Sequence, residues 1–208
     1  MLHRPVLKSL LRNTCAAHTR PCRFVSSLSE NLLNEISYVD REMPSDLLEM
    51  QKHIETRMIL KDTPGDAIVR LYANEECSAR FVVEFDCRDG NMYEEDADDA
   101  NEDDDAIMIP FVVNFTRGRD VLRFRCAASQ DVDIEGIEFF PNGDEREELY
   151  AGPQFDYLDE ELKESFHMYL KDSGVDHTLA SFIVKYTEFK EQQEYRTWLE
   201  KIQGYTVI

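Results

Sequence analysis

The sequence predicts an α+β protein in which an antiparallel sheet is flanked by N- and C-terminal helices. From about residue 67 to residue 140, the 208-residue chain holds short runs rich in β-branched and aromatic residues, joined by turn signals. On both sides of this region, apolar residues recur at the 3.6-residue spacing of an amphipathic helix. Strands joined by turns rather than by helices form an antiparallel meander.

The N-terminus is basic and predicts a targeting segment. Its first acidic residue is Glu30, and five Lys and Arg residues before it surround an apolar helical stripe. An acid-poor, Arg-rich amphipathic start is typical of a mitochondrial transit peptide, which we place at residues 1–25. The alternative is a basic arm that stays attached. No run approaches the roughly 18 apolar residues of a membrane span, so we expect no transmembrane segment and a matrix location.

The remaining residues 26–208 are expected to form one acidic domain that begins with a helical arm at residues 26–55. Leu28, Leu32 and Ile36 follow a helical spacing, and the stripe resumes after Pro44. Proline is disfavoured inside a helix but accepted at its first position. Pro44 therefore either kinks one long helix or opens a second.

Residues 56–150 are expected to form the sheet. Gly and Pro turn signals separate the strand-like runs. The clearest runs are residues 67–72, 79–87, 107–115, 121–126 and 134–140. An acidic loop at residues 88–106 would then be a long hairpin connection between the third and fourth strands.

This loop contains nine carboxylates within twelve positions, which we call the acidic run. Its members are Glu94, Glu95, Asp96, Asp98, Asp99, Glu102, Asp103, Asp104 and Asp105. No Lys or Arg occurs between Asp89 and Thr116, and the whole chain has a net charge of −20. Such a field attracts cations and repels polyanions, so we predict basic protein partners and no direct nucleic-acid binding through this acidic face.

Two other interpretations of the acidic run stay open. It could be a solvated loop that keeps the protein soluble. It could also bind divalent cations diffusely, which makes an acidic divalent-cation buffer or a calcium-responsive protein the alternative function. A specific EF-hand is not expected, because the register starting at Asp99 places Asp104 where Gly is needed and Pro110 where Glu is needed. No metal residue is assigned.

The sequence offers no constellation that predicts an enzyme. His53, His167 and His177 fall on separate predicted elements, and no nucleophile elbow, phosphate-binding loop or zinc-protease motif occurs. We therefore assign no catalytic residue and expect no cofactor. Cys77, Cys87 and Cys126 are too widely spaced for a metal knuckle and fit a reducing compartment.

Residues 157–204 predict two C-terminal helices. Gly174 is placed to end the first and Asp176 to cap the second. The stripe of the second helix is longer than one small sheet requires, so part of it should pack against the N-terminal helix or a neighbouring subunit. The residues assigned to helix or trimer packing are Phe182, Tyr186, Phe189, Tyr195, Trp198, Leu199 and Ile202.

Two C-terminal segments carry a family resemblance. Residues 170–180 read LKDSGVDHTLA and residues 191–200 read EQQEYRTWLE. With residues 111–113 after the acidic loop and residues 137–139 before the helices, they resemble the mitochondrial acidic matrix protein family. This mitochondrial glycoprotein family includes the complement component-binding protein of animal mitochondria. The resemblance covers roughly residues 55–205.

The resemblance implies more than the residues alone predict. It implies a twisted antiparallel sheet of seven strands, with N- and C-terminal helices in a coiled-coil-like contact, assembled into a ring-shaped homotrimer. It also implies a non-enzymatic role in mitochondrial RNA metabolism, translation or respiratory-chain maintenance, through binding or chaperoning of basic, RNA-binding or ribosomal proteins. This sequence differs in its shorter acidic loop and its longer helical arm.

Overall fold

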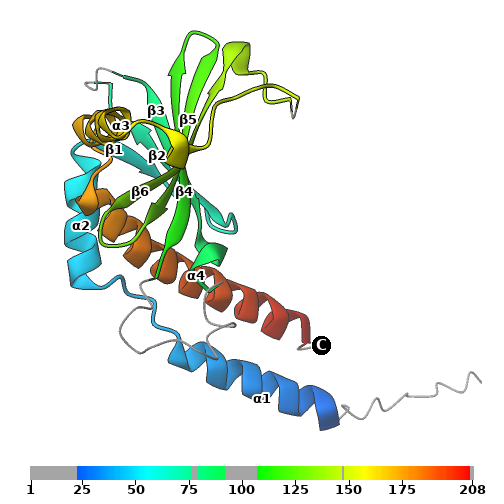
Figure 1. Cartoon of the computed structure of the whole chain (residues 1–208). Coiled ribbons are helices and arrows are strands. Elements are labelled where there is room, and N and C mark those ends of the chain that lie inside the picture. Colours follow the sequence, from blue (N-terminus) through cyan, green and yellow to red (C-terminus); the bar gives the residue numbers. More distant parts are fainter. Residues whose placement is uncertain (1–22, 76–78, 92–106, 147, 207–208) are drawn as a thin grey trace, which may run out of the picture.

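The α+β class predicted from the sequence is confirmed. A computed structural model describes residues 23–75, 79–91, 107–146 and 148–206. The nine carboxylates of the acidic run, and the proposed transit peptide up to residue 22, lie outside the described residues. Within the described part, helices cover one face of a single antiparallel sheet (Figure 1).

The sheet is a meander in which every strand pairs antiparallel with its sequence neighbour. Its strands are β1 (Met58–Lys61), β2 (Ile68–Ala73), β3 (Phe81–Asp86), β4 (Ile109–Arg117), β5 (Asp120–Ala128) and β6 (Val132–Phe140). The described residues thus form six strands, whereas the family resemblance implies seven. Strand β1 was not among the runs singled out in the sequence.

The outer edge of β6 is partly covered by the chain that follows it. The amide of Phe139 donates to the carbonyl of Ala151 at 2.7 Å, and Gly136 forms an isolated bridge with Gln154. These contacts satisfy edge groups that would otherwise be open to another strand. They lie where a further strand would pair, but the described backbone forms no continuous ladder there.

The two faces of the sheet differ because the strands alternate. In β3, Phe81, Val83 and Phe85 are buried, and the residues between them are half-buried. We call the buried side, which packs against the helices, the inner face, and the opposite side the outer face. On the outer face, Arg70 of β2 pairs with Glu84 of β3 at 2.6 Å.

Four helices build the layer on the inner face and an arm beside it. They are α1 (Arg23–Tyr38), α2 (Ser45–Glu55), α3 (Glu160–Asp172) and α4 (His177–Thr206). Of the two alternatives for Pro44, the structure has a second helix: α2 begins directly after Pro44, whose carbonyl accepts from the amide of Leu48 at 3.0 Å.

The corner between α3 and α4 has the predicted chemistry. Gly174 adopts a φ of 87°, which suits glycine, and the amide of Val175 donates back to the carbonyl of Leu170 at 2.9 Å. The carboxylate of Asp176 accepts from the amides of Thr178 and Leu179 at 3.0 and 3.1 Å. Both predictions, of the helix end and of the cap, are confirmed.

Helix α4 is longer than the sheet that it covers. Its 30 residues span about 45 Å at 1.5 Å per residue. Figure 1 shows that its C-terminal part extends away from the sheet beside α1, which runs in the opposite direction. We call residues 177–190 the proximal half of α4 and residues 191–206 the distal half.

Candidate interaction surfaces

The described residues on either side of the acidic run lie at one end of the sheet, where β3 ends and β4 begins. The chain leaves β3 through a short 3-10 turn, η1 (Cys87–Asn91), and re-enters the described residues at Ile107 before β4. In the sequence the run therefore falls between β3 and β4, which correspond to the predicted strand-like runs at residues 79–87 and 107–115. Ile107 and Met108, which lead into β4, are both exposed.

Turn η1 is fixed firmly against α4. Gly90 lies so close to the helix that an added Cβ would be 3.1 Å from Cγ2 of Thr187. The amide of Cys87 donates to the carbonyl of Ala67 at 3.0 Å, and the side chain is buried. Burial, together with the charge of Asp86, raises the pKa of the Cys87 thiol to about 11. The thiol is therefore neutral and structural at physiological pH.

Carboxylates gather around this turn. Asp86 is held by Arg88, whose hydrogen bonds lower the pKa of the carboxyl. The pKa of Asp89 is raised, first by burial and then by the charge of Asp86, and burial raises the pKa of Glu191 on α4. We call Asp86, Asp89 and Glu191 the acidic root. Two of its three members are more costly to ionise than usual, so a nearby cation would be stabilising.

The proximal half of α4 belongs to the core of its own chain. Phe182 and Tyr186 are buried, and Phe189 packs against the core. The ring of Tyr186 lies 5.0 Å from that of Phe182, 6.0 Å from that of Phe189 and 6.2 Å from that of Phe85, between centroids. Of the seven residues assigned to helix or trimer packing, these three pack mainly within the chain.

A buried lysine in the same half was missed by the sequence analysis. Lys190 is 3% exposed, and its Nζ lies 2.5 Å from Oδ1 of Asp62 and 2.6 Å from Oε1 of Glu194. Tyr186 donates to Asp62 at 2.8 Å, and the amide of Gly65 donates to Glu194 at 2.9 Å. This network ties α4 to the connection between β1 and β2.

The charge of Lys190 is retained despite its burial. Burial alone would lower its pKa, but hydrogen bonds to Asp62 and Glu194 outweigh burial, and the pKa is raised. The only sequence signal is the spacing of Tyr186, Lys190 and Glu194, which places them on one helical face.

The distal half of α4 packs on α1. Leu199 is buried, as is Leu32 on α1. Tyr195 stacks on Trp198 with an interplanar angle of 17° and 6.1 Å between centroids, and its hydroxyl donates to Glu35 at 3.2 Å. The expected contact with the N-terminal helix is therefore present. Ile202 is half-buried on the same half of the helix.

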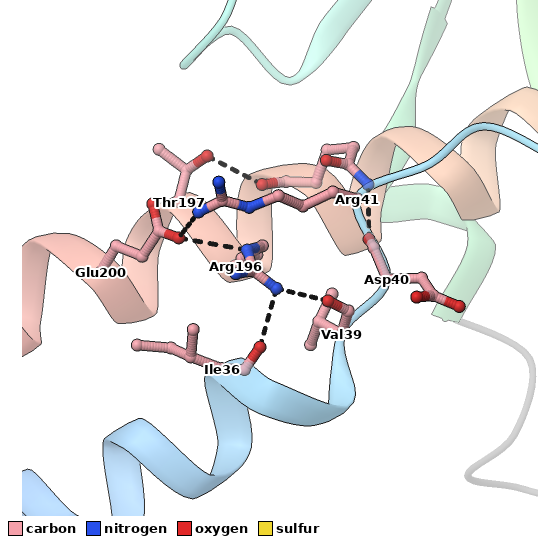
Figure 2. A network of polar contacts seen from close by, with 8 residues as sticks. Ile36, Val39, Asp40, Arg41, Arg196, Thr197 and Glu200 are labelled. Atoms are coloured by element: carbon pink, nitrogen blue, oxygen red, sulfur yellow. Dashed lines mark hydrogen bonds and ion pairs between the residues drawn. The ribbon is translucent and has the colours of Figure 1, made fainter.

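Arg196 fixes the end of α1 to α4, as Figure 2 shows. Its Nη1 donates to the carbonyls of Ile36, at 2.7 Å, and Val39, and its Nε lies 3.1 Å from Glu200. Arg41 reaches the same carboxylate at 2.5 Å. A guanidinium on the last carbonyls of a helix satisfies acceptors that the helix leaves open.

The arm formed by α1 and the distal half of α4 also leaves apolar side chains uncovered. Trp198 is 54% exposed. Other exposed large apolar residues of the two helices are Leu28, Leu33, Tyr38 and Tyr205. Exposed apolar side chains on neighbouring helices are typical of an interaction surface.

These observations define a class: an acidic protein with an antiparallel sheet, a helical layer and a two-helix arm. In the part of the chain that the structure describes, no group of three or more His, Cys, Asp or Glu side chains could hold a metal. No described helix is long and apolar enough to cross a membrane. Nothing described here indicates catalysis.

The chain belongs to the mitochondrial glycoprotein family, whose profile matches residues 32–206. It is 30% identical over 172 residues to the mitochondrial acidic protein mam33 of Schizosaccharomyces pombe, covering 71% of this chain and 63% of that protein. It is 34% identical over 101 residues to an uncharacterized mitochondrial protein of Arabidopsis thaliana, covering 47% and 40%. The chain thus matches less than two thirds of each relative. The names of these relatives support a mitochondrial location.

Two solved structures share the fold. The Trypanosoma brucei p22 protein superposes with a TM-score of 0.65 at 22% identity, covering 88% of this chain and 98% of that chain. A Leishmania major protein, described as a sequence homologue of human p32, gives a TM-score of 0.64 at 19% identity, covering 88% and 99%. At these identities the likeness establishes the fold alone.

Proposed function

We propose that the protein is a non-enzymatic adaptor or chaperone of the mitochondrial matrix. In this proposal it is a ring-shaped homotrimer that binds basic RNA-binding or ribosomal proteins through the acidic run. Binding would modulate mitochondrial RNA processing, translation or respiratory-chain maintenance.

The observation that carries the proposal is the attachment of the acidic run. Nine carboxylates follow a turn that lies against α4 at Gly90 and is bonded through Cys87 to Ala67, just before β2. A fixed attachment would present this charge at one end of the sheet. In a trimer the charge would be presented three times, so modest attractions could add up to useful avidity.

The exposed apolar side chains of the arm support the assembly part of the proposal. Trp198 and Leu33 lie uncovered on α4 and α1 although apolar side chains of this size gain from burial. A neighbouring copy that covered them would also hold the three acidic runs at fixed separations.

The test is charge reversal in the acidic run. Replacing Glu94, Glu95, Asp96, Asp98 and Asp99 by Lys should abolish capture of basic proteins from matrix extract while the trimer persists in sedimentation. A matched control reverses five exposed acids elsewhere, which are Glu49, Asp156, Glu164, Asp172 and Glu188. Both variants change the net charge equally.

A salt series and a nuclease arm complete the design. Capture should weaken steeply with ionic strength, because exposed charges are screened over about 8–10 Å. Nuclease treatment should leave capture intact if the partner is a protein. Equal capture by the reversal variant and the wild type at moderate salt would refute the docking role, and a stable wild-type monomer would refute the trimer.

A further inference from the structure

An apolar groove lies on the outer face of the sheet, apart from the helical layer. It has a volume of about 260 Å³. Ile68 of β2 and Pro110 and Val112 of β4 contribute apolar side chains, and Ile68 is 39% exposed. The groove is open and small beside the roughly 300–1,000 Å³ typical of small-molecule sites. It therefore suits one protruding side chain of a larger partner.

The strand register places this groove next to the acidic root. Ile68 pairs with Asp86, the last residue of β3, and Pro110 is the second residue of β4. The groove thus lies at the end of the sheet where the chain departs into the acidic run and returns from it. Ile107 and Met108, which precede β4 at this end of the sheet, are also exposed.

The rim of the groove is acidic. Glu84, Asp86, Asp89 and Glu135 line it together with Arg125. Glu84 is already paired with Arg70 and Asp86 with Arg88, which leaves Asp89 and Glu135 for the cations of a partner. Arg125 is turned along the sheet toward Glu138 at 3.2 Å, over Gly136, where an added Cβ would lie 2.4 Å from its Nη2. The rim therefore has an excess of negative charge around an apolar floor.

We propose that this groove seats the apolar anchor of the basic segment that the acidic run attracts. The inference rests on the proposed function and names the partner's chemistry: a Lys- or Arg-rich segment that carries an aliphatic or aromatic side chain. Asp89 and Glu135 pair with its cationic residues, and the anchor enters the groove over β3, between Ile68 of β2 and Val112 of β4. A hydrophobic contact of this kind is far less salt-sensitive than exposed ion pairs.

The charge of the rim selects this occupant. A purely apolar surface would desolvate Asp89 and Glu135 without giving them partners, which is unfavourable. An anionic ligand would be repelled by Asp89 and Glu135. A basic segment with one apolar side chain pairs its charges with the acidic rim and buries its apolar side chain against the apolar floor.

Two synthetic peptides test the proposal with the full chain. One is a 15-residue peptide of Lys and Ser with a central Leu, and the other has Ser in place of that Leu. Wild-type protein should bind the Leu peptide about tenfold more tightly, as burial of one aliphatic side chain allows. This ratio should persist as salt rises, while both affinities fall.

Variants then locate the anchor. Ile68→Ser with Val112→Ser should bind both peptides equally, at the affinity that wild type shows for the Ser peptide. Ile59→Ser, on exposed β1 outside the groove, is the matched control and should keep the tenfold ratio. Circular dichroism and the melting temperature show whether each variant is folded.

The outcomes separate this inference from the proposed function. Reversing the acidic run should lower the affinity for both peptides, and if it does not, the docking role fails. If reversal lowers both affinities but wild type does not distinguish the peptides, only the groove is overturned. A tenfold ratio that survives in the Ile68 and Val112 variant would also overturn it.

Discussion

The two halves of α4 are one continuous helix in different surroundings. In the proximal half, Phe182 is fully buried under the sheet. In the distal half, Trp198 is 54% exposed although it is the larger side chain. The difference indicates that the proximal half holds the fold, while the distal half is available for contacts that a single chain does not complete.

The largest expected effect comes from truncating one aromatic side chain in each half of α4 and comparing the losses of stability. Phe182→Ala should lower the free energy of unfolding by about 3–5 kcal/mol, because it leaves a cavity in the core. Trp198→Ala should cost less than about 1 kcal/mol in the single chain, since the ring is mostly solvated, and should weaken assembly instead. Urea unfolding of each variant, with sedimentation of the folded protein, measures both quantities. If Phe182→Ala and Trp198→Ala lowered the free energy of unfolding equally, the two halves would not differ in their contribution to the fold.

The sequence predicts the proximal half better than the distal one. The spacing of Phe182, Tyr186 and Phe189 places them on one face, and the amphipathic pattern alone indicates that this face is buried. The same pattern continues through Trp198 but does not say what covers it. Periodicity identifies a face, whereas burial depends on which elements reach that face.

Other elements mark the limits of sequence-based prediction. The caps of the α3–α4 corner depend on neighbouring residues and were predicted, because Gly174 and Asp176 act within a few positions of themselves. Strand β1 has only four residues, too few for a clear alternation. The burial of Lys190 depends on Asp62, 128 positions earlier in the chain, and no local pattern reports such a pairing.

The candidate site also combines features set by neighbouring residues, which the sequence predicts, with features set by distant residues, which it does not. The position of the acidic run between the strands at residues 79–87 and 107–115 could be predicted, since charge runs and strand signals are local. The groove beside it could not, because Ile68 and Val112 meet only through the strand register. Specific binding surfaces often combine residues that are distant in the sequence. Composition alone therefore predicts the sign of a partner's charge but not the site at which the partner binds.

The next prediction concerns the buried charge that anchors the proximal half. Lys190→Ala should cost about 3 kcal/mol, because Asp62 and Glu194 would face each other without the ammonium between them. This is the lower end of the range for breaking buried pairs, since the two carboxylates are about a quarter exposed.

The matched control for Lys190 is another lysine of the same half. Lys185→Ala removes an exposed lysine that pairs with Asp46 at 2.5 Å and should cost less than about 1 kcal/mol. Urea unfolding at neutral pH compares the two variants. A cost for Lys190→Ala no larger than that for Lys185→Ala would mean that the network adds nothing to the anchoring of this half.

The smallest expected effect lies at the first turn of α4 and depends on pH. Burial would raise the pKa of Asp176, but hydrogen bonds from Arg57, at 2.9 Å, and from the amides of Leu179 and Thr178 outweigh burial, and the pKa is lowered. A depressed carboxyl pKa stabilises the fold above the unfolded value of about 3.9. That contribution is lost as the pH falls through the lower, folded pKa.

Asp176→Asn keeps an oxygen for the cap but removes the charge beside Arg57. It should lower the free energy of unfolding by about 1 kcal/mol at neutral pH, with the difference from wild type shrinking below about pH 4. Asp159→Asn is the control at α3, where an amide oxygen can replace the carboxylate that accepts from Glu161 at 3.0 Å; it should change stability by a few tenths of a kcal/mol, about 0.3. Urea unfolding between pH 3 and pH 7 measures both. A constant difference down to pH 3 would show that the charge of Asp176 does not anchor the proximal half, and that the corner depends on the cap geometry alone.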